Sequence, residues 1–427
     1  MTITSLDSRS ASARAVRVLL VTALVLVPAA AATAGRASAA SGPTAADRTA
    51  AARLKTRFPA AGLGSGRVGK VLDVASGRTV WSSRAGTGRM PASTEKLAVA
   101  VSALTVLGPG HTERTRTRYQ AGTLYLVGGG DQLLTTADLK ALAVATAKAL
   151  KQHGLKATAL RVDDSLFPAP TAADASPGWL RGYYPSELAP VRALALSGAR
   201  VSDTALAAGK LFAQQLAAAG VRLPAGAPKR KTAPASAVDL ASHTSKPLSK
   251  AVEHMLKVSD NNTAEGLLRL TALAEHRPAT WQGGTAAVRA VLTGYGVPLA
   301  GVKLYDGSGL SRSDRMTASA LAALVALSVE PRYDKQLWPL FDGLPVAGRD
   351  GTLAASEHRF TTRPSSCAAG RVHAKTGSLH DADALVGVTK GKDGRWKAFA
   401  FVENGPVSAA GARRGLDGLA ATVDGCW

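Results

Sequence analysis

Three short stretches decide how this chain is interpreted: Ser93-Thr94-Glu95-Lys96, Ser259-Asp260-Asn261 and Lys375-Thr376-Gly377. Each of them is too short to be informative alone. Taken together and in this order, they supply a serine nucleophile, a lysine base, a polar bridge and a cationic clamp for a carboxylate. The places of the three stretches in the predicted fold decide whether they can act together.

The first stretch follows a predicted β-hairpin and a glycine-rich loop. Residues 68–81 show strand patterns on either side of a turn signal at Ser76-Gly77. From Ser93 onward the apolar residues recur at helical spacing, and the pattern ends at Gly108. Because positions three apart share one face of a helix, Lys96 is within reach of the Ser93 hydroxyl.

The first stretch also has the properties that acyl transfer needs. A lysine is a base only when it is neutral, and its ordinary pKa is about 10.4. Burial lowers that pKa, and so does a second cation, which Lys375 would supply. The backbone N–H of Ser93 at a helix start would be one donor of an oxyanion hole, and the N–H of Ser378 would be the other. Alone, a serine and a lysine at this spacing are more often a coincidence on a helix surface.

The second stretch falls between two predicted helices, over 248–256 and 263–274. In the functional interpretation, Ser259 bridges the two lysines and relays a proton, while Asn261 holds a substrate amide. In the structural alternative, Asp260 and Asn261 simply cap the following helix, as Asx residues often do. The two interpretations are compatible with each other.

The third stretch is predicted to lie on a strand. Lys375 and Thr376 can bind a terminal carboxylate through charge and a hydroxyl group, and an exposed lysine at a strand end is the alternative. Gly377 has no side chain, which lets a substrate backbone approach the strand closely. His373 lies on the same strand face as Lys375, where packing is favoured over catalysis.

Strand patterns near both ends of the chain, with helices between them, predict a layered α/β (α+β) fold with a central antiparallel sheet. This domain is expected to combine residues 40–110 and 246–427. Residues 111–245 carry short strands, two Ala-rich helices and a linker at about 224–237, and they are predicted to form one or more smaller inserted domains. The insertion separates the first stretch from the second.

The first 39 residues are predicted to be a secretory signal peptide. Arg14 and Arg17 precede an apolar run, and Ala37-Ser38-Ala39 is a small-x-small cleavage signal. The alternative is a membrane anchor, for which the run is short. We therefore expect a secreted protein that acts outside the cytoplasm, at the cell wall.

Composition limits the cofactors and partners. Cys367 and Cys426 are an even pair, which in a secreted chain predicts one disulfide, with two buried thiols as the alternative. The sequence predicts no metal-type cluster and no cofactor. The net charge of +22 comes from scattered Lys and Arg residues, which disfavours a nucleic-acid partner. It is compatible with electrostatic association with the anionic cell wall, or simply with solubility.

The three stretches together resemble the D-alanyl-D-alanine carboxypeptidase/endopeptidase family, which are low-molecular-mass class C penicillin-binding proteins with an inserted domain. The resemblance runs from about Val68 to the end of the chain. Three further stretches share it: Leu126-Val127-Gly128-Gly129-Gly130-Asp131, Val162-Asp163-Asp164-Ser165-Leu166-Phe167 and Asp306-Gly307-Ser308-Gly309-Leu310-Ser311-Arg312. It implies a β-lactamase/transpeptidase-like domain.

The resemblance implies a serine-type D-Ala-D-Ala carboxypeptidase that acts on peptidoglycan stem peptides, with endopeptidase activity left open. An acyl-enzyme would form on Ser93, with Lys96 as the base, and β-lactam antibiotics would be covalent inhibitors. The other implied residues are Ser259, Asn261 and Lys375 in catalysis and Thr376, Gly377 and Ser378 in substrate binding. Two departures from the family pattern are Ser378, where threonine is common, and the polar pair His380-Asp381.

Two rival functions stay open. A secreted β-lactamase shares the three stretches, but this chain lacks the Glu-x-x-x-Asn context of its additional glutamate and carries a large insertion. A non-catalytic cell-wall-binding protein of the same fold is permitted by the charge and the insertion. Against it, all three stretches are intact.

Overall fold

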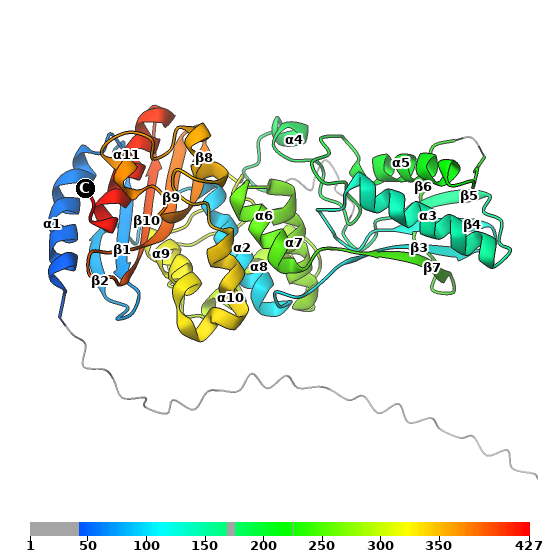
Figure 1. Ribbon diagram of the computed structural model, residues 1–427, viewed down its shortest axis with the longest axis horizontal. Helices are drawn as coiled ribbons and strands as arrows, with labels where there is room; N and C mark the ends of the chain where they lie inside the picture. The colour runs from blue at the N-terminus through cyan, green and yellow to red at the C-terminus, as the bar shows by residue number, and fades with distance from the viewer. Residues whose placement is uncertain (1–41, 169–175, 225) are drawn as a thin grey trace, which may run out of the picture. The chain divides into compact units, whose positions relative to one another are not determined.

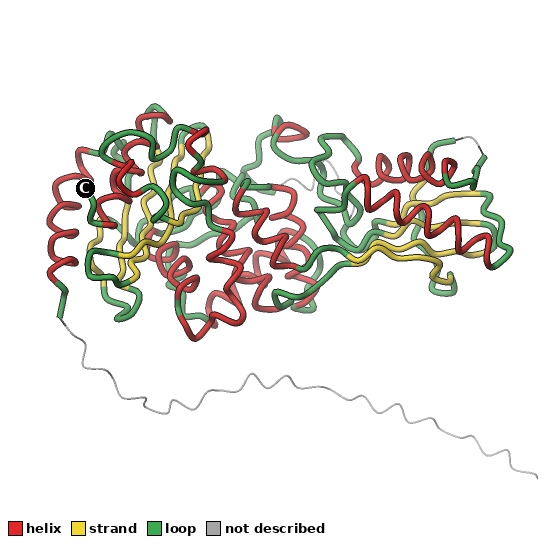
Figure 2. The backbone as a smooth tube through the Cα atoms, viewed as in Figure 1, coloured by secondary structure: helices red, strands yellow, loops and turns green. Residues whose placement is uncertain are grey.

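Two five-stranded sheets organise the chain (Figures 1 and 2). The structure is a computed structural model that describes residues 42–168, 176–224 and 226–427. The predicted signal peptide, residues 1–39, lies outside the described residues. Within the described part, no helix combines the length and the apolar character needed to span a membrane.

The first sheet is antiparallel throughout and is built from both ends of the chain. Its order is β2 (Thr79–Ser83), β1 (Val68–Asp73), β10 (Trp396–Asn404), β9 (Ala382–Lys390) and β8 (His373–Leu379). The N-terminal hairpin joins the C-terminal strands through β1 and β10, where Val68 lies opposite Val402. The predicted hairpin and the predicted antiparallel sheet are therefore confirmed. Since β8 is an edge strand, one row of its backbone groups faces away from the sheet.

Helices cover both faces of this sheet, and they include α1 (Ala45–Ala60), α11 (Ala409–Asp424), α2 (Lys96–Val106) and α9 (Ala318–Ala326). Alternate residues of β10 face opposite layers. Phe399 and Phe401 pack in an apolar cluster with α1 and α11, whereas Ala400 packs in the cluster that contains α2 and α9. Each fully buried phenylalanine contributes about 1.5–3 kcal/mol relative to an exposed one.

The helix α2 is buried on all sides. The helices that pack around it include α6 (Leu248–Lys257), α7 (Asn261–Ala274), α8 (Trp281–Gly294) and α10 (Asp334–Gly343). Apart from Lys96 and Ser102, its first nine residues are all Leu, Ala or Val, and a helix that is apolar all round belongs in a core. A 3-10 turn over Ala92–Glu95 leads into it, so the α-helix predicted from Ser93 begins three residues later, at Lys96.

The second sheet is formed entirely by residues between Arg114 and Thr244. Its order is β6 (Lys229–Arg230), β5 (Ala159–Asp163), β4 (Thr123–Val127), β3 (Arg114–Gln120) and β7 (Val238–Thr244). The parallel strands β4 and β5 are joined through α3 (Thr136–Gln152), which packs with α5 (Thr204–Ala218) over one apolar cluster. A short helix, α4 (Tyr183–Ser186), lies between β5 and α5. The domain boundaries at residues 110 and 245 stay a prediction.

Several elements have no clear pattern in the sequence. β3 reads RTRTRYQ and lacks an apolar face, yet Thr115 and Thr117 are buried because β4 and β7 flank the strand on both sides. α1 is polar apart from a few residues such as Leu54 and Phe58, so its helical stripe is weak. α8 and α10 were also not predicted, and the predicted linker 224–237 contains the edge strand β6.

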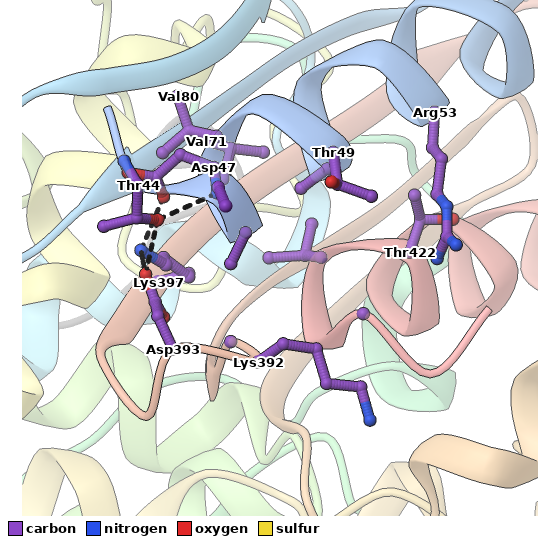
Figure 3. Close-up of a pocket in the computed structure, with 16 residues that line it drawn as sticks. Thr44, Asp47, Thr49, Arg53, Val71, Val80, Lys392, Asp393, Lys397 and Thr422 are labelled. Carbon is purple, nitrogen blue, oxygen red and sulfur yellow. Dashed lines mark hydrogen bonds and ion pairs between the residues drawn. The ribbon is translucent and has the colours of Figure 1, made fainter. Parts of the chain in front are cut away.

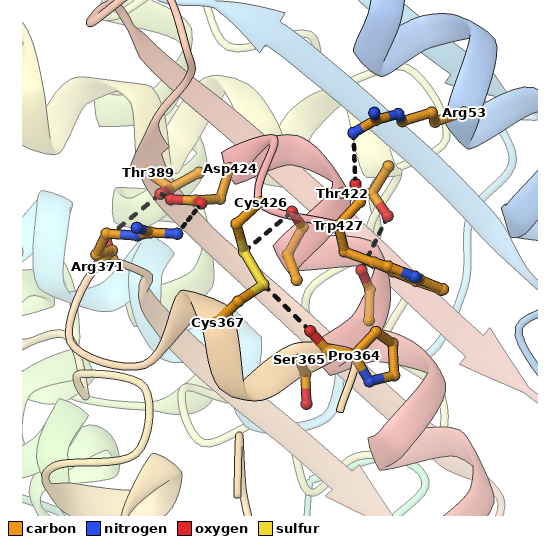
Figure 4. The surroundings of a disulfide bond; sticks show 12 residues. Arg53, Pro364, Ser365, Cys367, Arg371, Thr389, Thr422, Asp424, Cys426 and Trp427 are labelled. Carbon is orange, nitrogen blue, oxygen red and sulfur yellow. Dashed lines mark hydrogen bonds and ion pairs between the residues drawn. A yellow bond between two sulfur atoms is a disulfide. The ribbon is translucent and has the colours of Figure 1, made fainter. Parts of the chain in front are cut away.

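A disulfide joins Cys367 to Cys426, the pairing predicted from the two cysteines (Figure 4). The two Cα atoms are 6.0 Å apart, and the bond connects the segment before β8 to the end of α11. Beside it, Asp424 accepts hydrogen bonds from Arg371 and Thr389. A loop of this length can stabilise the fold by ~4 kcal/mol in the chain-entropy treatment.

The N-terminal helix α1 is also attached by a cluster of charged side chains (Figure 3). Nζ of Lys397 donates to Asp47 at 2.6 Å, to Asp73 at 2.8 Å and to Asp393 at 2.9 Å. The cluster thereby joins α1, β1 and the β9–β10 turn, at one end of a hollow of about 580 Å³. Burial disfavours the charged forms of both the carboxyl groups and the amine. The hydrogen bonds outweigh burial, so the pKa of Asp73 falls to about 2 and the pKa of Lys397 rises.

We expect Lys397→Met to lower the free energy of unfolding by ~3–5 kcal/mol, because three carboxylates then lose their shared cation. Urea denaturation at pH 7 followed by tryptophan fluorescence measures this change. Lys392→Met is the matched control, since Lys392 lines the same hollow but is exposed. Equal losses in the two variants would contradict the assignment.

The same cluster predicts an acid dependence of stability. The folded-state pKa of Asp73 is about 2 and its ordinary value is 3.8. Its contribution is therefore fully present above about pH 4 and is lost as the pH falls through 2. Wild type should lose stability over this window more steeply than Lys397→Met in the same urea titrations.

Candidate active site

The turn that carries Ser93 is held between a strand and a loop by two glycines. A Cβ atom on Gly377 of β8 would lie 2.6 Å from the carbonyl oxygen of Pro91, and one on Gly309 would lie 2.0 Å from that of Ala92. Ala92 itself has a φ of +47°, which non-glycine residues rarely adopt. The backbone around the predicted nucleophile is therefore fixed from both sides.

This packing changes the explanation of one predicted residue. From the sequence, the missing side chain of Gly377 was expected to make room for substrate. In the structure, the space that its side chain would need is taken by Pro91, Ala92 and Thr94. The glycine is required by the close approach of β8 to the turn that carries Ser93.

Lys96 is completely buried at the start of α2 and has three oxygen neighbours. Its Nζ lies 2.8 Å from Oγ of Ser93, 2.8 Å from Oδ1 of Asn261 and 2.6 Å from the carbonyl oxygen of Ser308. The predicted contact between Ser93 and Lys96 is therefore present. A neutral amine can donate to Asn261 and Ser308 and still accept the proton of Ser93 with its lone pair.

Burial lowers the pKa of Lys96 to about 8, although the negative charges of nearby acidic groups oppose the shift. The opposing groups are Asp306, Glu265, Asp260 and Glu95. From the sequence we expected two causes of this shift, burial and the charge of Lys375. Burial is the dominant cause, and Lys375 is not among the main contributions. The shift leaves a useful neutral fraction of Lys96 near neutral pH.

The second stretch occupies the break between α6 and α7, as predicted, and its two Asx residues have different tasks. Asp260 is the N-cap of α7 and accepts a hydrogen bond from the N–H of Thr263 at 2.8 Å. Asn261 does not cap; its Oδ1 accepts from Lys96 and its Nδ2 donates to the carbonyl of Glu187 at 2.9 Å. The capping interpretation is therefore confirmed for Asp260 alone. The role of Asn261 in holding a substrate amide stays a prediction.

Ser259 contacts one of the two lysines that it was predicted to bridge. Its Oγ accepts from Nζ of Lys375 at 3.0 Å, whereas the hydrogen bonds of Lys96 in the described structure go to other residues. Ser259 has a φ of +61°, a conformation that the surrounding packing has to enforce. The serine hydroxyl is thus coupled to the third stretch and is placed by a strained turn.

Lys375 is fully buried rather than exposed at a strand end. Besides Ser259, it donates to the carbonyl of Thr376 at 2.7 Å. Burial lowers the pKa of Lys375 well below its ordinary value, and the charges of Lys96 and Arg359 add to the shift. A carboxylate placed beside Lys375 would favour its charged form.

The remaining predicted residues lie along β8. Thr376 shares a 2.7 Å hydrogen bond with the hydroxyl of Thr352, and the exposed Ser378 donates to Asp383 at 2.9 Å. The oxyanion-hole role of the Ser93 and Ser378 N–H groups stays a prediction. The ring of His373 stacks on Phe341 with centroids 4.4 Å apart, as expected for a packed histidine.

Two parts of the site were not predicted from the sequence. The loop over residues 306–312 was noted only for its resemblance, yet its Ser308 carbonyl contacts Lys96. Glu265 holds that loop, because its Oε1 accepts from the N–H groups of Gly307 at 3.0 Å and Ser308 at 2.8 Å. The sequence offered one signal for Glu265: it is an acidic residue inside the apolar pattern of a helix, α7.

The sequence predicted no metal-type cluster, but two groups of three acidic side chains converge in the structure. One is Asp47, Asp73 and Asp393, and the other is Glu95, Asp306 and Asp314. In the first group the ammonium of Lys397 stands where a cation would bind. The second group lies near Lys96, whose charge acts on Glu95, and none of its three members forms a salt bridge with the described residues.

Comparisons with known proteins identify the family of this chain. The family model for the D-Ala-D-Ala carboxypeptidase 3 (S13) family matches residues 51–199 and 180–424. Carboxypeptidase DacB of Mycolicibacterium smegmatis is 33% identical over 84% of this chain and 80% of its own. D-alanyl-D-alanine carboxypeptidase of Actinomadura sp. is 29% identical over 78% of this chain and 77% of its own.

Solved structures show the same fold. Penicillin-binding protein 4 of Haemophilus influenzae superposes with a TM-score of 0.70 at 23% identity, over 85% of this chain and 98% of that one. The predicted β-lactamase/transpeptidase-like fold, the resemblance and the serine carboxypeptidase class are therefore confirmed: the chain belongs to the D-Ala-D-Ala carboxypeptidase 3 (S13) family.

Proposed function

We propose that this D-Ala-D-Ala carboxypeptidase forms its acyl-enzyme on Ser93, with Lys96 as the general base, and that it acts on peptidoglycan stem peptides. The observation that carries the proposal is the 2.8 Å contact between Oγ of Ser93 and a buried amine whose pKa is about 8. A lysine tuned in this way can accept a proton near neutral pH, which an exposed lysine cannot do efficiently.

In acylation, neutral Lys96 takes the hydroxyl proton as Oγ of Ser93 attacks the carbonyl carbon of the penultimate D-alanine. The N–H groups of Ser93 and Ser378 would stabilise the oxyanion. The C–N bond then breaks. The amine of the departing D-alanine takes the proton that Lys96 received from Ser93. Ser259, hydrogen-bonded to Lys375, is the hydroxyl through which this proton can pass.

In deacylation, water replaces the departed D-alanine. Lys96, neutral again, takes a proton from the water as its oxygen attacks the ester carbon. Oγ of Ser93 leaves and recovers its proton, which restores the resting state. The same base thus serves both half-reactions in the proposal.

The third stretch is the proposed recognition site for the substrate carboxylate. Lys375 and Thr376 lie on the edge strand, and the buried Lys375 has no carboxylate partner among the described residues. A terminal carboxylate would supply the missing counter-charge. Asn261 would orient the substrate amide. β-Lactams carry a comparable carboxylate, and the Haemophilus influenzae penicillin-binding protein 4 has a structure in complex with a β-lactam.

We further propose the location and organisation that the sequence predicts. Residues 1–39 would be removed on secretion, and the mature enzyme would work at the cell wall, where the positive charge of the chain, +22 for the full sequence, favours anionic polymers. Residues 111–245 would be the inserted part and residues 40–110 and 246–427 the catalytic domain. The second sheet, which uses only residues from the middle of the chain, supports this division.

The nucleophile can be tested with a fluorescent penicillin. We expect wild type to become covalently labelled and Ser93→Ala to remain unlabelled, because no oxygen is left to form the ester. Ser102→Ala is the matched control, since Ser102 is buried on the same helix with no hydrogen-bond partner among the described residues. Gel fluorescence measures the label after denaturation.

Equal labelling of wild type and Ser93→Ala would refute Ser93 as the nucleophile. The lifetime of the label separates the proposal from its rival: a β-lactamase would release the penicillin within seconds and turn it over. Mass analysis of a pentapeptide and a cross-linked muropeptide after incubation then shows which bonds the enzyme cuts.

The base can be tested by the pH dependence of acylation. Only neutral Lys96 is competent and its pKa is about 8, so the rate should rise with pH and level off above about pH 9. At pH 6 the neutral fraction predicts a rate about a hundredfold below the plateau. Stopped-flow labelling with fluorescent penicillin measures the rate, and circular dichroism checks that the fold is unchanged across the range. A flat profile between pH 6 and 9 would exclude Lys96 as the titrating base.

A further inference from the structure

Four acidic side chains lie buried beneath the turn that carries Ser93. They are Glu95, Glu265, Asp306 and Asp314, each no more than 1% exposed. Two of them are fully engaged by donors. Glu265 accepts from two backbone N–H groups and the indole N–H of Trp281, and Asp306 accepts from the N–H groups of Gly309 and Ser311 and from Trp179.

Glu95 and Asp314 are different, because their carboxyl groups lack such donors. Neither carboxyl oxygen of Glu95, nor Oδ2 of Asp314, accepts from an N–H or hydroxyl group of the described residues. Only Oδ1 of Asp314 has a donor, the N–H of Tyr305 at 2.7 Å. A carboxyl oxygen of Glu95 instead lies within 4.8 Å of one of Asp314, and the two side chains are hydrogen-bond partners of each other.

A hydrogen bond between two carboxyl groups exists only when one of them carries a proton. Two buried carboxylates in contact cannot both be ionised, because their repulsion adds to the cost of removing each charge from water. We propose that Glu95 and Asp314 share one proton in the resting enzyme, and that this pair is a positioning element that fixes the charge beneath Lys96.

The charged groups around the pair support a shared proton. Burial together with the charges of Asp306 and Glu265 raises the pKa of Glu95 well above its ordinary value, and burial with Asp306 and Glu95 does the same for Asp314. Lys96 is the cation that faces Glu95, and Arg269 is engaged with Glu265 at 3.6 Å. Asp306 therefore adds negative charge beside both members of the pair and Glu265 adds it beside Glu95, against the one cation that faces Glu95.

A metal ion is the other way to join these carboxyl groups, since oxygens of Glu95, Asp306 and Asp314 all lie within 4.8 Å of one another. The donor set argues against it. The two oxygens of Asp306 together already accept three N–H bonds, so one lone pair of this carboxylate is left for an ion. A proton between Glu95 and Asp314 needs no third ligand.

The pair matters for catalysis through its net charge. With one proton for two carboxyl groups, it contributes one negative charge near Lys96, and the charge of Glu95 is among those that raise the pKa of Lys96. This consequence rests on the proposed role of Lys96 as the base. The shared proton itself does not depend on that role.

Infrared spectroscopy of the full enzyme at pH 7.5 tests the proton directly. We expect a carboxylic acid C=O band in wild type, at a pH where exposed carboxyl groups are ionised. Glu95→Gln and Asp314→Asn should each lose it, because an amide then donates to the remaining carboxylate. Glu403→Gln is the control for assignment, since Glu403 is another buried carboxyl group: burial raises its pKa, and the charges of Arg67 and Arg89 oppose that shift. It should leave the band in place.

The pH profile of acylation tests the effect on Lys96. Either single variant keeps one negative charge in the pair, so the midpoint of the profile should stay within a few tenths of a pH unit. The double variant Glu95→Gln/Asp314→Asn removes that charge, so the midpoint should fall by on the order of one pH unit. If the pair had only a structural role, the midpoint of the pH profile would shift by the same amount in the single and the double variants.

Three outcomes would overturn the inference. The first is the absence of a carboxylic acid band that depends on both residues. The second is a midpoint that moves equally in the single and double variants. The third is a divalent ion that copurifies with wild type and is lost in Glu95→Gln, which would assign the cluster to a metal. If the band is present but Ser93→Ala is still labelled, the proposed nucleophile fails and the shared proton stands.

Discussion

The site depends on the burial of one amine, that of Lys96, at the start of a helix with no exposed face. An ammonium group there would need full compensation, and the structure offers two neutral oxygens and a serine hydroxyl within 2.8 Å. Three surrounding elements position these acceptors: α7 carries Asn261, the loop over 306–312 carries Ser308, and the 3-10 turn carries Ser93. The low dielectric that makes Lys96 a base is therefore the product of five packed helices and a sheet.

Much of this site could be predicted because its geometry is local. The spacing of Ser93 and Lys96 is fixed by helix geometry, and the break before Asn261 is visible as a loss of helical pattern. The contact between Lys96 and Ser308 could not be predicted, because it joins residues 212 positions apart and uses a backbone carbonyl that has no sequence signature. The same holds for Glu95, whose partner Asp314 lies in a distant loop. Its place inside the first stretch gave no hint of a buried acidic pair.

The fold shows the same limit. β9 and β10 were visible as apolar runs since both their faces are buried. β3 was not, because its buried positions are threonines and its other face carries arginines. α1 was missed because its apolar stripe is narrow, formed by Leu54 and Phe58, and because part of its attachment is electrostatic, through Asp47 and the buried Lys397. Hydrophobic periodicity reveals helices and strands that bury apolar side chains. It does not reveal elements that are held in place by flanking strands or by ion pairs.

The pairing of β1 with β10 sets an order of events during biosynthesis. Ser93 lies early in the chain, but its turn packs against Gly377 of β8, and β8 reaches the N-terminal hairpin only through β9 and β10. When the first three hundred residues have been synthesised, the first two stretches are present but β8, β9 and β10 of the first sheet are not. Such distant contacts form late and slowly. The site can therefore be complete only after nearly the whole chain has been made.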